Sequence, residues 1–234
     1  MLKKSDLYDY NSVCLEFYTS IISHIDCFSI YYEVVIIQIV LASASPRRSK
    51  LLEQIGLDFM IVPSKINEGN NDDLSPAELV QHLAYQKAMH IAQKMAQTGG
   101  NNRFLVIGAD TVVVKDGILL GKPADKQEAF CILSRLSGEW HEVLTGIALI
   151  DTQDFKCIKG FETTRVKMKE LSDDTIFAYI DSKEPMDKAG AYGIQEKGAV
   201  MVEKIEGCYF NVVGLPLSRL AELLKEFGVF ILQK

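Results

Sequence analysis

The sequence has little of the chemistry that marks metal centres built from cysteine and histidine. Its five cysteines are odd in number and show no C-x-x-C spacing, and its four histidines form no H-E-x-x-H or comparable pair. This pattern argues against a disulfide framework and a zinc site, and it favours a reducing compartment. A G-x-S-x-G elbow is also missing, which disfavours a serine hydrolase.

An excess of positive charge is missing too. The 234 residues carry a formal net charge of −6, whereas a surface that binds nucleic acid is usually basic and often studded with aromatic side chains. We therefore expect no nucleic-acid partner, and we interpret basic residues that cluster as a local anion pocket.

No apolar run is long and uninterrupted enough to predict a membrane span. Residues 17–41 are rich in Ile, Tyr, Phe and Val, but polar and charged residues interrupt them, and a spanning helix needs about 20 predominantly apolar residues. A signal-peptide cut within 42–44 would destroy the motif that lies there. We expect a cytoplasmic protein with no membrane partner, in which 1–35 is an extension of unknown role and 36–234 is one domain.

The first stretch rich in information follows this extension. An apolar, β-branched run predicts a buried strand at 36–41, after which Ser45 predicts the N-cap of a helix and Pro46 its first position. Arg47 and Arg48 then stand in the first helical turn, where the helix dipole disfavours each cation by about 0.3–1 kcal/mol. We interpret them as ligands of an anion such as phosphate; two solvated surface arginines are the alternative.

Asp110 is the only charged residue in the run 104–114, which otherwise predicts a buried strand in which Gly108 allows close backbone approach. A buried carboxylate must be paired, hydrogen-bonded or bound to a metal. Asp110 is therefore a candidate site residue, and an aspartate that satisfies a turn or caps a helix is the alternative. Lys122, set between a glycine and a proline, is a second candidate anion ligand.

Two further residues are ambiguous from the sequence alone. Glu68 lies in a polar loop at 64–74 and is, by itself, an exposed carboxylate. Lys87 falls on the apolar face of a helix that Ser75 and Glu78 open with a capping box. There it either extends harmlessly to the surface or binds a ligand.

Strands and helices alternate along the chain, with hairpins between some of the strands. This order predicts an α/β fold, a single domain with a mixed central sheet flanked by helices. Near the C-terminus we expect a long glycine-bearing loop at 184–195, a strand at 199–205, a loop with a Gly-Leu-Pro turn, and a closing helix that starts at Leu217.

Five motifs stand in a characteristic order: Ala42-Ser43-Ala44-Ser45-Pro46-Arg47-Arg48, Gly108-Ala109-Asp110-Thr111, Gly121-Lys122-Pro123, Ser137-Gly138 and Asp187-Lys188-Ala189-Gly190-Ala191-Tyr192-Gly193-Ile194-Gln195. Through them, residues 38 to about 228 resemble the Maf (septum formation) family of nucleoside triphosphate pyrophosphatases, in particular its dTTP/UTP-type subfamily. The resemblance implies an elongated α/β fold similar to that of inosine triphosphate pyrophosphatases, with the site in a cleft. It also implies hydrolysis of nucleoside triphosphates to the monophosphate and pyrophosphate with Mg²⁺ or Mn²⁺, often by homodimers.

The resemblance also implies roles for single residues. Asp110 matches the catalytic proton acceptor, and Glu68 and Asp110 together match the metal ligands. Three positions match those that set substrate preference: Arg47, Thr111 and Gln195. The full expected site comprises catalytic Asp110, Glu68 and Lys122 and substrate-binding Ser43, Ser45, Arg47, Arg48, Lys87, Thr111, Lys188 and Gln195.

Two alternatives stay open. The working substrate is either dTTP and UTP themselves or a modified pyrimidine nucleotide that the cell removes. The chain is either an enzyme or a nucleotide-responsive cell-division regulator that binds with little turnover. Two departures from the family pattern bear on the site: Glu196 follows Gln195 where relatives often have a small residue, and Asn67 stands where an acidic neighbour of Glu68 is frequent.

Overall fold

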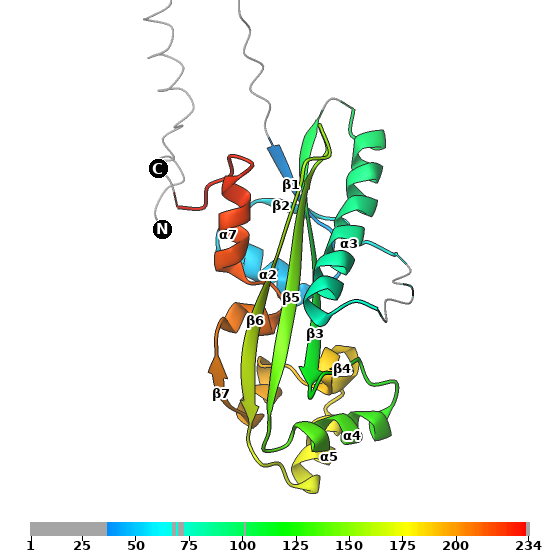
Figure 1. Ribbon diagram of the computed structural model, residues 1–234, viewed down its shortest axis with the longest axis vertical. Coiled ribbons are helices and arrows are strands. Elements are labelled where there is room, and N and C mark those ends of the chain that lie inside the picture. The colour runs from blue at the N-terminus through cyan, green and yellow to red at the C-terminus, as the bar shows by residue number, and fades with distance from the viewer. Residues whose placement is uncertain (1–36, 67–68, 70–72, 101, 233–234) are drawn as a thin grey trace, which may run out of the picture. The chain divides into compact units, whose positions relative to one another are not determined.

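A seven-stranded mixed sheet organises the part of the chain that the computed structural model describes, residues 37–66, 69, 73–100 and 102–232 (Figure 1). The strands are β1 (Ile37–Leu41), β2 (Phe59–Ile61), β3 (Arg103–Lys115), β4 (Ile118–Leu120), β5 (Trp140–Asp151), β6 (Cys157–Met168) and β7 (Val202–Glu206). The helices are α2 (Pro46–Gln54), α3 (Pro76–Thr98), α4 (Lys126–Leu136), α5 (Asp173–Asp181), α6 (Tyr209–Val213) and α7 (Leu217–Lys225). Three short 3₁₀ helices complete the set: η2 (Glu184–Asp187), η3 (Ala189–Ala191) and η4 (Glu196–Met201).

The strand order is β2-β1-β3-β5-β6-β7, and β4 pairs separately with β3. β1 is parallel to both of its neighbours, whereas along the order β3, β5, β6 and β7 each strand runs antiparallel to the next. The parallel pairs are joined through helices and the β3–β4 and β5–β6 pairs by short turns, as their geometry requires. The predicted α/β fold with a mixed sheet is therefore confirmed.

Strand periodicity explains how β3 separates two layers of the core. Successive side chains of a strand point to opposite faces. Leu105, Ile107 and Ala109 pack with α2 and α7, while Phe104 and Val106 pack with α3. Figure 1 shows α3 on one side of the sheet and α2 and α7 on the other, with α4 and α5 near the end of β3 that carries β4.

Local signals in the sequence account for most element boundaries. Ser75 and Glu78 form the predicted capping box at the start of α3. Asp116 and Gly117 both have positive φ, as a two-residue turn between antiparallel strands requires, and they join β3 to β4. Asp125 caps α4 through the backbone N–H of Glu128. The predicted capping box is therefore confirmed.

The segment after residue 183 differs from the expectation. The predicted loop at 184–195 contains η2 and η3, and the strand predicted at 199–205 begins only at Val202 because η4 occupies 196–201. A Cβ at Gly198 would lie 2.1 Å from the carbonyl oxygen of Gly193, so the chain crosses itself closely there. Such a backbone contact leaves no repeat of apolar residues with the period of a strand or a helix, so the sequence pattern could not predict it.

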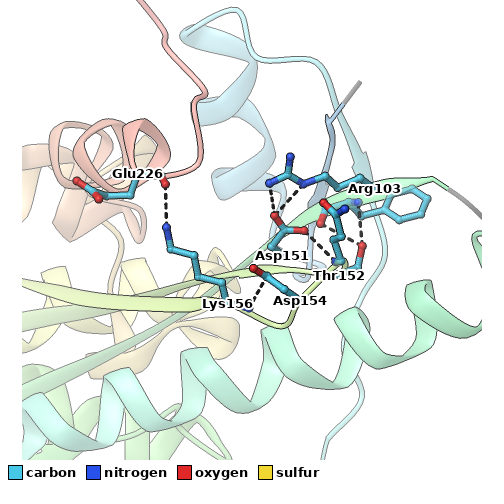
Figure 2. A network of polar contacts seen from close by, with 8 residues as sticks. Arg103, Asp151, Thr152, Asp154, Lys156 and Glu226 are labelled. Carbon is cyan, nitrogen blue, oxygen red and sulfur yellow. Dashed lines mark hydrogen bonds and ion pairs between the residues drawn. The ribbon is translucent and has the colours of Figure 1, made fainter. Parts of the chain in front are cut away.

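A polar network fixes the end of the sheet at which β3 begins (Figure 2). Both Nε and Nη2 of Arg103 donate to Oδ2 of Asp151, at 2.8 and 2.5 Å. The hydroxyl of Thr152 accepts from the backbone N–H of Phe104 at 2.9 Å. Lys156, past the β5–β6 turn, donates to the carbonyl oxygen of Glu226 beyond α7 at 3.1 Å. The network joins β3, the β5–β6 turn and the chain after α7. Because it lies at the opposite end of β3 from the turn to β4, away from Asp110, we interpret it as structural.

Among the described residues, no helix combines the length and the apolar composition needed to cross a membrane. The predicted extension 1–35 lies outside the described residues.

Candidate active site

One edge of β3 is left open between two partner strands. β1 pairs with this edge as far as Ile107, and β4 pairs with it again from Val113. On the other edge, β5 pairs with β3 continuously from Leu105 to Val114. Residues 108–112 therefore have no strand neighbour on the first edge within the described part of the chain. Asp110 lies in the middle of this gap.

A cavity of about 690 Å³ opens at the gap. Its lining comes from many segments, among them the start of α2, one face of α3, the middle of β3, the turn after β4, the chain from η2 to η4, and the end of α6. Of the residues expected at the site, the lining includes Ser45, Arg47, Arg48, Lys87, Asp110, Thr111, Lys122, Lys188 and Gln195. Residues that are scattered over 150 positions of the sequence thus face one space of the size that small-molecule ligands occupy.

Two glycines bring α3 close to the sheet beside Asp110. A Cβ at Gly108 would lie 2.2 Å from the carbonyl oxygen of Ala84, and a Cβ at Gly146 would lie 2.2 Å from that of Val80. Gly146 is the register partner of Asp110, so the close approach surrounds the carboxylate. The next turn of α3 carries Lys87 on the same helix face.

Lys87 and Asp110 form an ion pair in the cavity wall. Nζ of Lys87 lies 2.5 Å from Oδ1 of Asp110. The two side chains are only 16 % and 13 % exposed, so neither is a solvated surface charge. The alternative of a harmless surface Lys87 is therefore wrong. Oδ2 of Asp110 accepts no hydrogen bond from the described residues, which leaves that oxygen for a ligand.

Arg48 is tied to three segments at once. Its Nε donates to the carbonyl oxygen of Gly214 at 2.8 Å, Nη1 to Oγ of Ser43 at 3.2 Å, and Nη2 to Oγ1 of Thr111 at 3.1 Å. These bonds join the start of α2 to β3 and to the residue after α6. The guanidinium therefore holds the wall of the cavity together, in addition to any contact with a ligand.

Arg47 and Lys188 share one carboxylate across the mouth of the cavity. Nη1 of Arg47 lies 3.2 Å from Oδ2 of Asp187, and Nζ of Lys188 lies 2.8 Å from Oδ1 of the same residue. Burial alone would raise the pKa of Asp187, but the hydrogen bonds from Lys188 and Arg47 outweigh it and hold this pKa below its usual range. All three residues also line a smaller cavity of about 360 Å³, together with Gln195.

The serines before α2 act differently from the expectation. Ser45 has the extended backbone of an N-cap, but its side chain makes no cap hydrogen bond. Instead, the backbone N–H of Ser45 donates to Oγ of Ser43 at 3.2 Å. Ser43 is nearly buried, with an exposed fraction of 8 %, and it supports the turn that precedes the helix.

The remaining expected residues differ in how far the structure describes them. Lys122 is exposed and lines the cavity without a hydrogen bond or ion pair to another described residue. Gln195 is half-buried in the wall. Glu68 lies outside the described residues, so its predicted role as a metal ligand stays a prediction. No cluster of three or more His, Cys, Asp and Glu side chains occurs in the described ranges.

Sequence reasoning missed a buried pair that supports the cavity wall. Nε2 of His141 and the hydroxyl of Tyr192 lie 2.7 Å apart, with the rings edge to face. Burial lowers the pKa of His141 to about 4, and the positive charge of Lys115 adds to the effect. Burial also raises the pKa of Tyr192. Tyr192 lines the cavity between Lys188 and Gln195, and only its place in the glycine-bearing motif indicated that it matters.

Comparison with known proteins identifies the family. The model of the family described as Maf-like protein matches residues 38–227. The chain belongs to the Maf family.

Similar Maf proteins carry one name. A protein of Acetivibrio thermocellus named dTTP/UTP pyrophosphatase is 66 % identical over 199 residues, which cover 85 % of this chain and 99 % of that protein. Proteins with the same name from Thermoanaerobacter sp. strain X514 and Caldicellulosiruptor bescii are 50 % and 47 % identical. The matches cover 83 % and 82 % of this chain, and 100 % and 95 % of those proteins.

Among solved structures, a crystal structure titled nucleoside-triphosphatase/dITP/XTP pyrophosphatase from Mycobacterium abscessus has a TM-score of 0.32 and 15 % sequence identity. It covers 56 % of this chain and 72 % of that one, so the likeness is weak.

Proposed function

We propose that this Maf protein hydrolyses pyrimidine nucleoside triphosphates, dTTP and UTP or modified analogues of them, to the monophosphate and pyrophosphate. The observation that carries the proposal is Asp110, a nearly buried carboxylate in a cavity that also presents Lys87, Lys122, Lys188 and Arg47. A general base among several cations suits attack by water on a polyphosphate. The name shared by relatives that are 47–66 % identical supports the choice of substrate.

Asp110 is the base in this mechanism. The ammonium of Lys87 donates to Oδ1 and fixes the orientation of the carboxylate. Oδ2 then orients the attacking water in line with the leaving group and takes its proton. A positioned base of this kind contributes about 10²–10⁴-fold to a rate, and holding the water in line contributes further through orientation.

The cations of the cavity stabilise the leaving group. Cleavage between the α- and β-phosphates expels pyrophosphate, whose negative charge grows in the transition state. Lys122, Lys188 and Arg47 lie on different segments of the wall, so they contact the polyphosphate from several sides. Preorganised cations aimed at developing charge are among the largest contributions to catalysis.

A divalent cation, Mg²⁺ or Mn²⁺, fits the residues present. Mg²⁺ in nucleotide sites is commonly bound by one or two carboxylates together with substrate phosphates. Asp110 would offer one of its remaining lone pairs, besides the one that receives the proton of the water, and Glu68 is the predicted second ligand. When bound, the cation neutralises phosphate charge and lowers the pKa of a coordinated water.

The test is pyrophosphate release from a panel of pyrimidine, purine and modified nucleoside triphosphates, with Mg²⁺, with Mn²⁺ and with a chelator. Asp110→Asn, which keeps the size and hydrogen-bonding shape of the side chain, is assayed beside the wild type. We expect turnover of dTTP and UTP that needs the cation and falls at least 100-fold in the variant. Tight nucleotide binding by the folded wild type without pyrophosphate release would favour the regulatory role instead.

A homodimer and a cytoplasmic location complete the proposal. Size-exclusion chromatography with light scattering tests the first, and fractionation of cells tests the second.

A further inference from the structure

A buried hydroxyl lies behind the cavity wall at the centre of the sheet. Thr145 of β5 is fully buried and is the register partner of Thr111 of β3. Their Oγ1 atoms lie 2.9 Å apart. Oγ1 of Thr145 also lies 3.0 Å from the carbonyl oxygen of Asn211 in α6. Thr111 lines the cavity, whereas Thr145 and Asn211 do not.

Arg48, Thr111, Thr145 and the carbonyl of Asn211 form a chain of hydrogen bonds. The chemistry of its two end groups fixes which atom donates in each bond. Arginine only donates and a carbonyl oxygen only accepts, while each threonine hydroxyl carries one hydrogen. Nη2 of Arg48 therefore donates to Thr111, and Thr145 donates its hydrogen to the carbonyl of Asn211. The contact between the threonines is then satisfied only if Thr111 donates to Thr145. The reverse direction would set two lone pairs against each other at 3.0 Å.

Thr111 is left without a hydrogen for the cavity. Its hydrogen points toward Thr145, and one lone pair of Oγ1 accepts the N–H of Arg48. Only the second lone pair can therefore form a hydrogen bond with a ligand. We propose that Thr145 is a positioning residue that makes Thr111 an obligate hydrogen-bond acceptor, and that the ligand group facing Thr111 is therefore an N–H or O–H donor. This inference rests on the proposed function and deepens it.

The proposal excludes several parts of a nucleotide from this position. Ionised phosphate oxygens and the N3 atom of cytosine are acceptors, and an acceptor facing Thr111 would find no hydrogen. The remaining candidates are the imide N3–H that uracil and thymine share and a hydroxyl of the sugar. Thr111 thus faces the nucleoside half of the substrate, and an imide contact would also select uracil and thymine against cytosine.

α6 holds the acceptor at the end of this chain in place. The side-chain Nδ2 of Asn211 donates to the carbonyl oxygen of Val143 at 2.8 Å and to Oγ1 of Thr164 at 3.0 Å. Asn211 is fully buried. The carbonyl oxygen that accepts the hydrogen of Thr145 therefore cannot move without breaking two buried hydrogen bonds. The donor and acceptor roles along the hydrogen-bond chain are fixed for this reason.

A matched pair of variants tests the proposal. Thr145→Val removes the hydroxyl and keeps the shape, whereas Thr145→Ser keeps the hydroxyl and removes a methyl group. Thr164→Val weakens the support of α6 without touching Thr111, so it controls for a loosened wall. Urea unfolding establishes that each variant is folded. The substrates are UTP, CTP, whose N3 atom accepts instead of donating, and 3′-O-methyl-UTP, whose ether oxygen can only accept.

In the wild type we expect kcat/KM to fall about tenfold, mainly through KM, for the analogue that lacks the donor facing Thr111. CTP identifies the imide and 3′-O-methyl-UTP the hydroxyl. In Thr145→Val the hydrogen of Thr111 is free to turn to the cavity and meet the acceptor that this analogue presents, so UTP and that analogue should differ less than threefold. Thr145→Ser and Thr164→Val should keep the wild-type ratio.

Three results would overturn the inference while leaving pyrophosphate release intact. The first is a wild type that accepts both analogues as well as UTP. The second is a Thr145→Val variant that keeps the wild-type ratio of kcat/KM between UTP and the analogue. The third is a Thr164→Val variant in which this ratio falls as it is expected to fall in Thr145→Val. A wild type that hydrolyses no nucleotide overturns the proposed function instead, and the same ratios are then measured as dissociation constants by calorimetry.

Discussion

Lys87 and Asp110 meet at 2.5 Å between a helix and a strand that glycines bring together. The pair depends on this packing, because Lys87 comes from α3 and Asp110 from β3. Removing one partner of a nearly buried ion pair leaves the other charge uncompensated, which is far costlier than losing a surface pair.

Lys87→Met should therefore lower the free energy of unfolding by about 3 kcal/mol, measured by urea denaturation. Asp110→Asn is the comparison variant. It leaves the charge of Lys87 without its counter-charge, but asparagine still accepts a hydrogen bond from the ammonium, so it should cost less, about 1–2 kcal/mol. A Lys87→Met protein as stable as the wild type would mean that the pair contributes nothing net to folding.

Gly108→Ala should separate α3 from the sheet. The added Cβ would meet the carbonyl oxygen of Ala84 at 2.2 Å and the backbone nitrogen of Ala88 at 2.8 Å, and neither is a side chain that can turn aside. We expect a loss of about 2–3 kcal/mol in the free energy of unfolding, together with lower turnover because Lys87 leaves Asp110. Gly121→Ala, where nothing lies within 4 Å of the new Cβ, should stay within about 0.5 kcal/mol of the wild type.

Asp187→Asn should increase the affinity for nucleotide. Its carboxylate forms ion pairs with both Arg47 and Lys188, so a substrate anion that binds these cations must displace it. We expect KM to fall about threefold to tenfold with little change in kcat. Stability should change by less than about 1 kcal/mol, since the Asp187 side chain is 64 % exposed.

The control for that variant is Asp181→Asn, which breaks the similarly exposed Lys126–Asp181 pair away from the cavity. It should leave KM unchanged. A KM that rises in Asp187→Asn would instead show that the carboxylate orients the two cations for the substrate.

His141→Gln should flatten the response of stability to acid. The pKa of His141 is about 4 in the folded protein, against 6.5 for the unfolded chain. As the pH falls through this window, the unfolded state takes up the proton first, so folding stability decreases with falling pH. Between pH 7 and pH 4 the wild type should lose about 3 kcal/mol more than the glutamine variant. Equal losses in the two proteins would mean that His141 is not buried in its neutral form.

The sequence predicts the parts of this fold whose signals are local. The capping box of Ser75 and Glu78 depends on neighbours within a few positions, and it is confirmed. The turn at Asp116 and Gly117 is equally local, since both residues have the positive φ that a two-residue hairpin turn needs. α6 has only five residues and no side-chain cap. Its position is set by Asn211, whose partners come from β5 and β6. Such a helix has no periodicity to recognise, and we predicted a loop there.

The candidate site shows the same division. Asp110 stands out in the sequence as a lone charge in an apolar strand. The bare pattern did not decide between two roles for Lys87, because its partner lies 23 positions along the chain and meets it only through tertiary packing. Asp187 belongs to a motif but had no predicted role, and Thr145 is an ordinary strand residue in the sequence. The importance of both comes from the side chains that they contact in the folded protein.

The neighbouring residues Asp110 and Thr111 lie on opposite faces of β3, one toward α3 and Lys87, the other toward α2 and Arg48. A single inserted or deleted residue in this strand would exchange the two faces for every position beyond it. The segment from Gly108 to Val113 therefore cannot change in length. Insertions and deletions between homologues should fall in the β5–β6 turn, where the length of the chain can vary while the chemistry of the cavity is preserved.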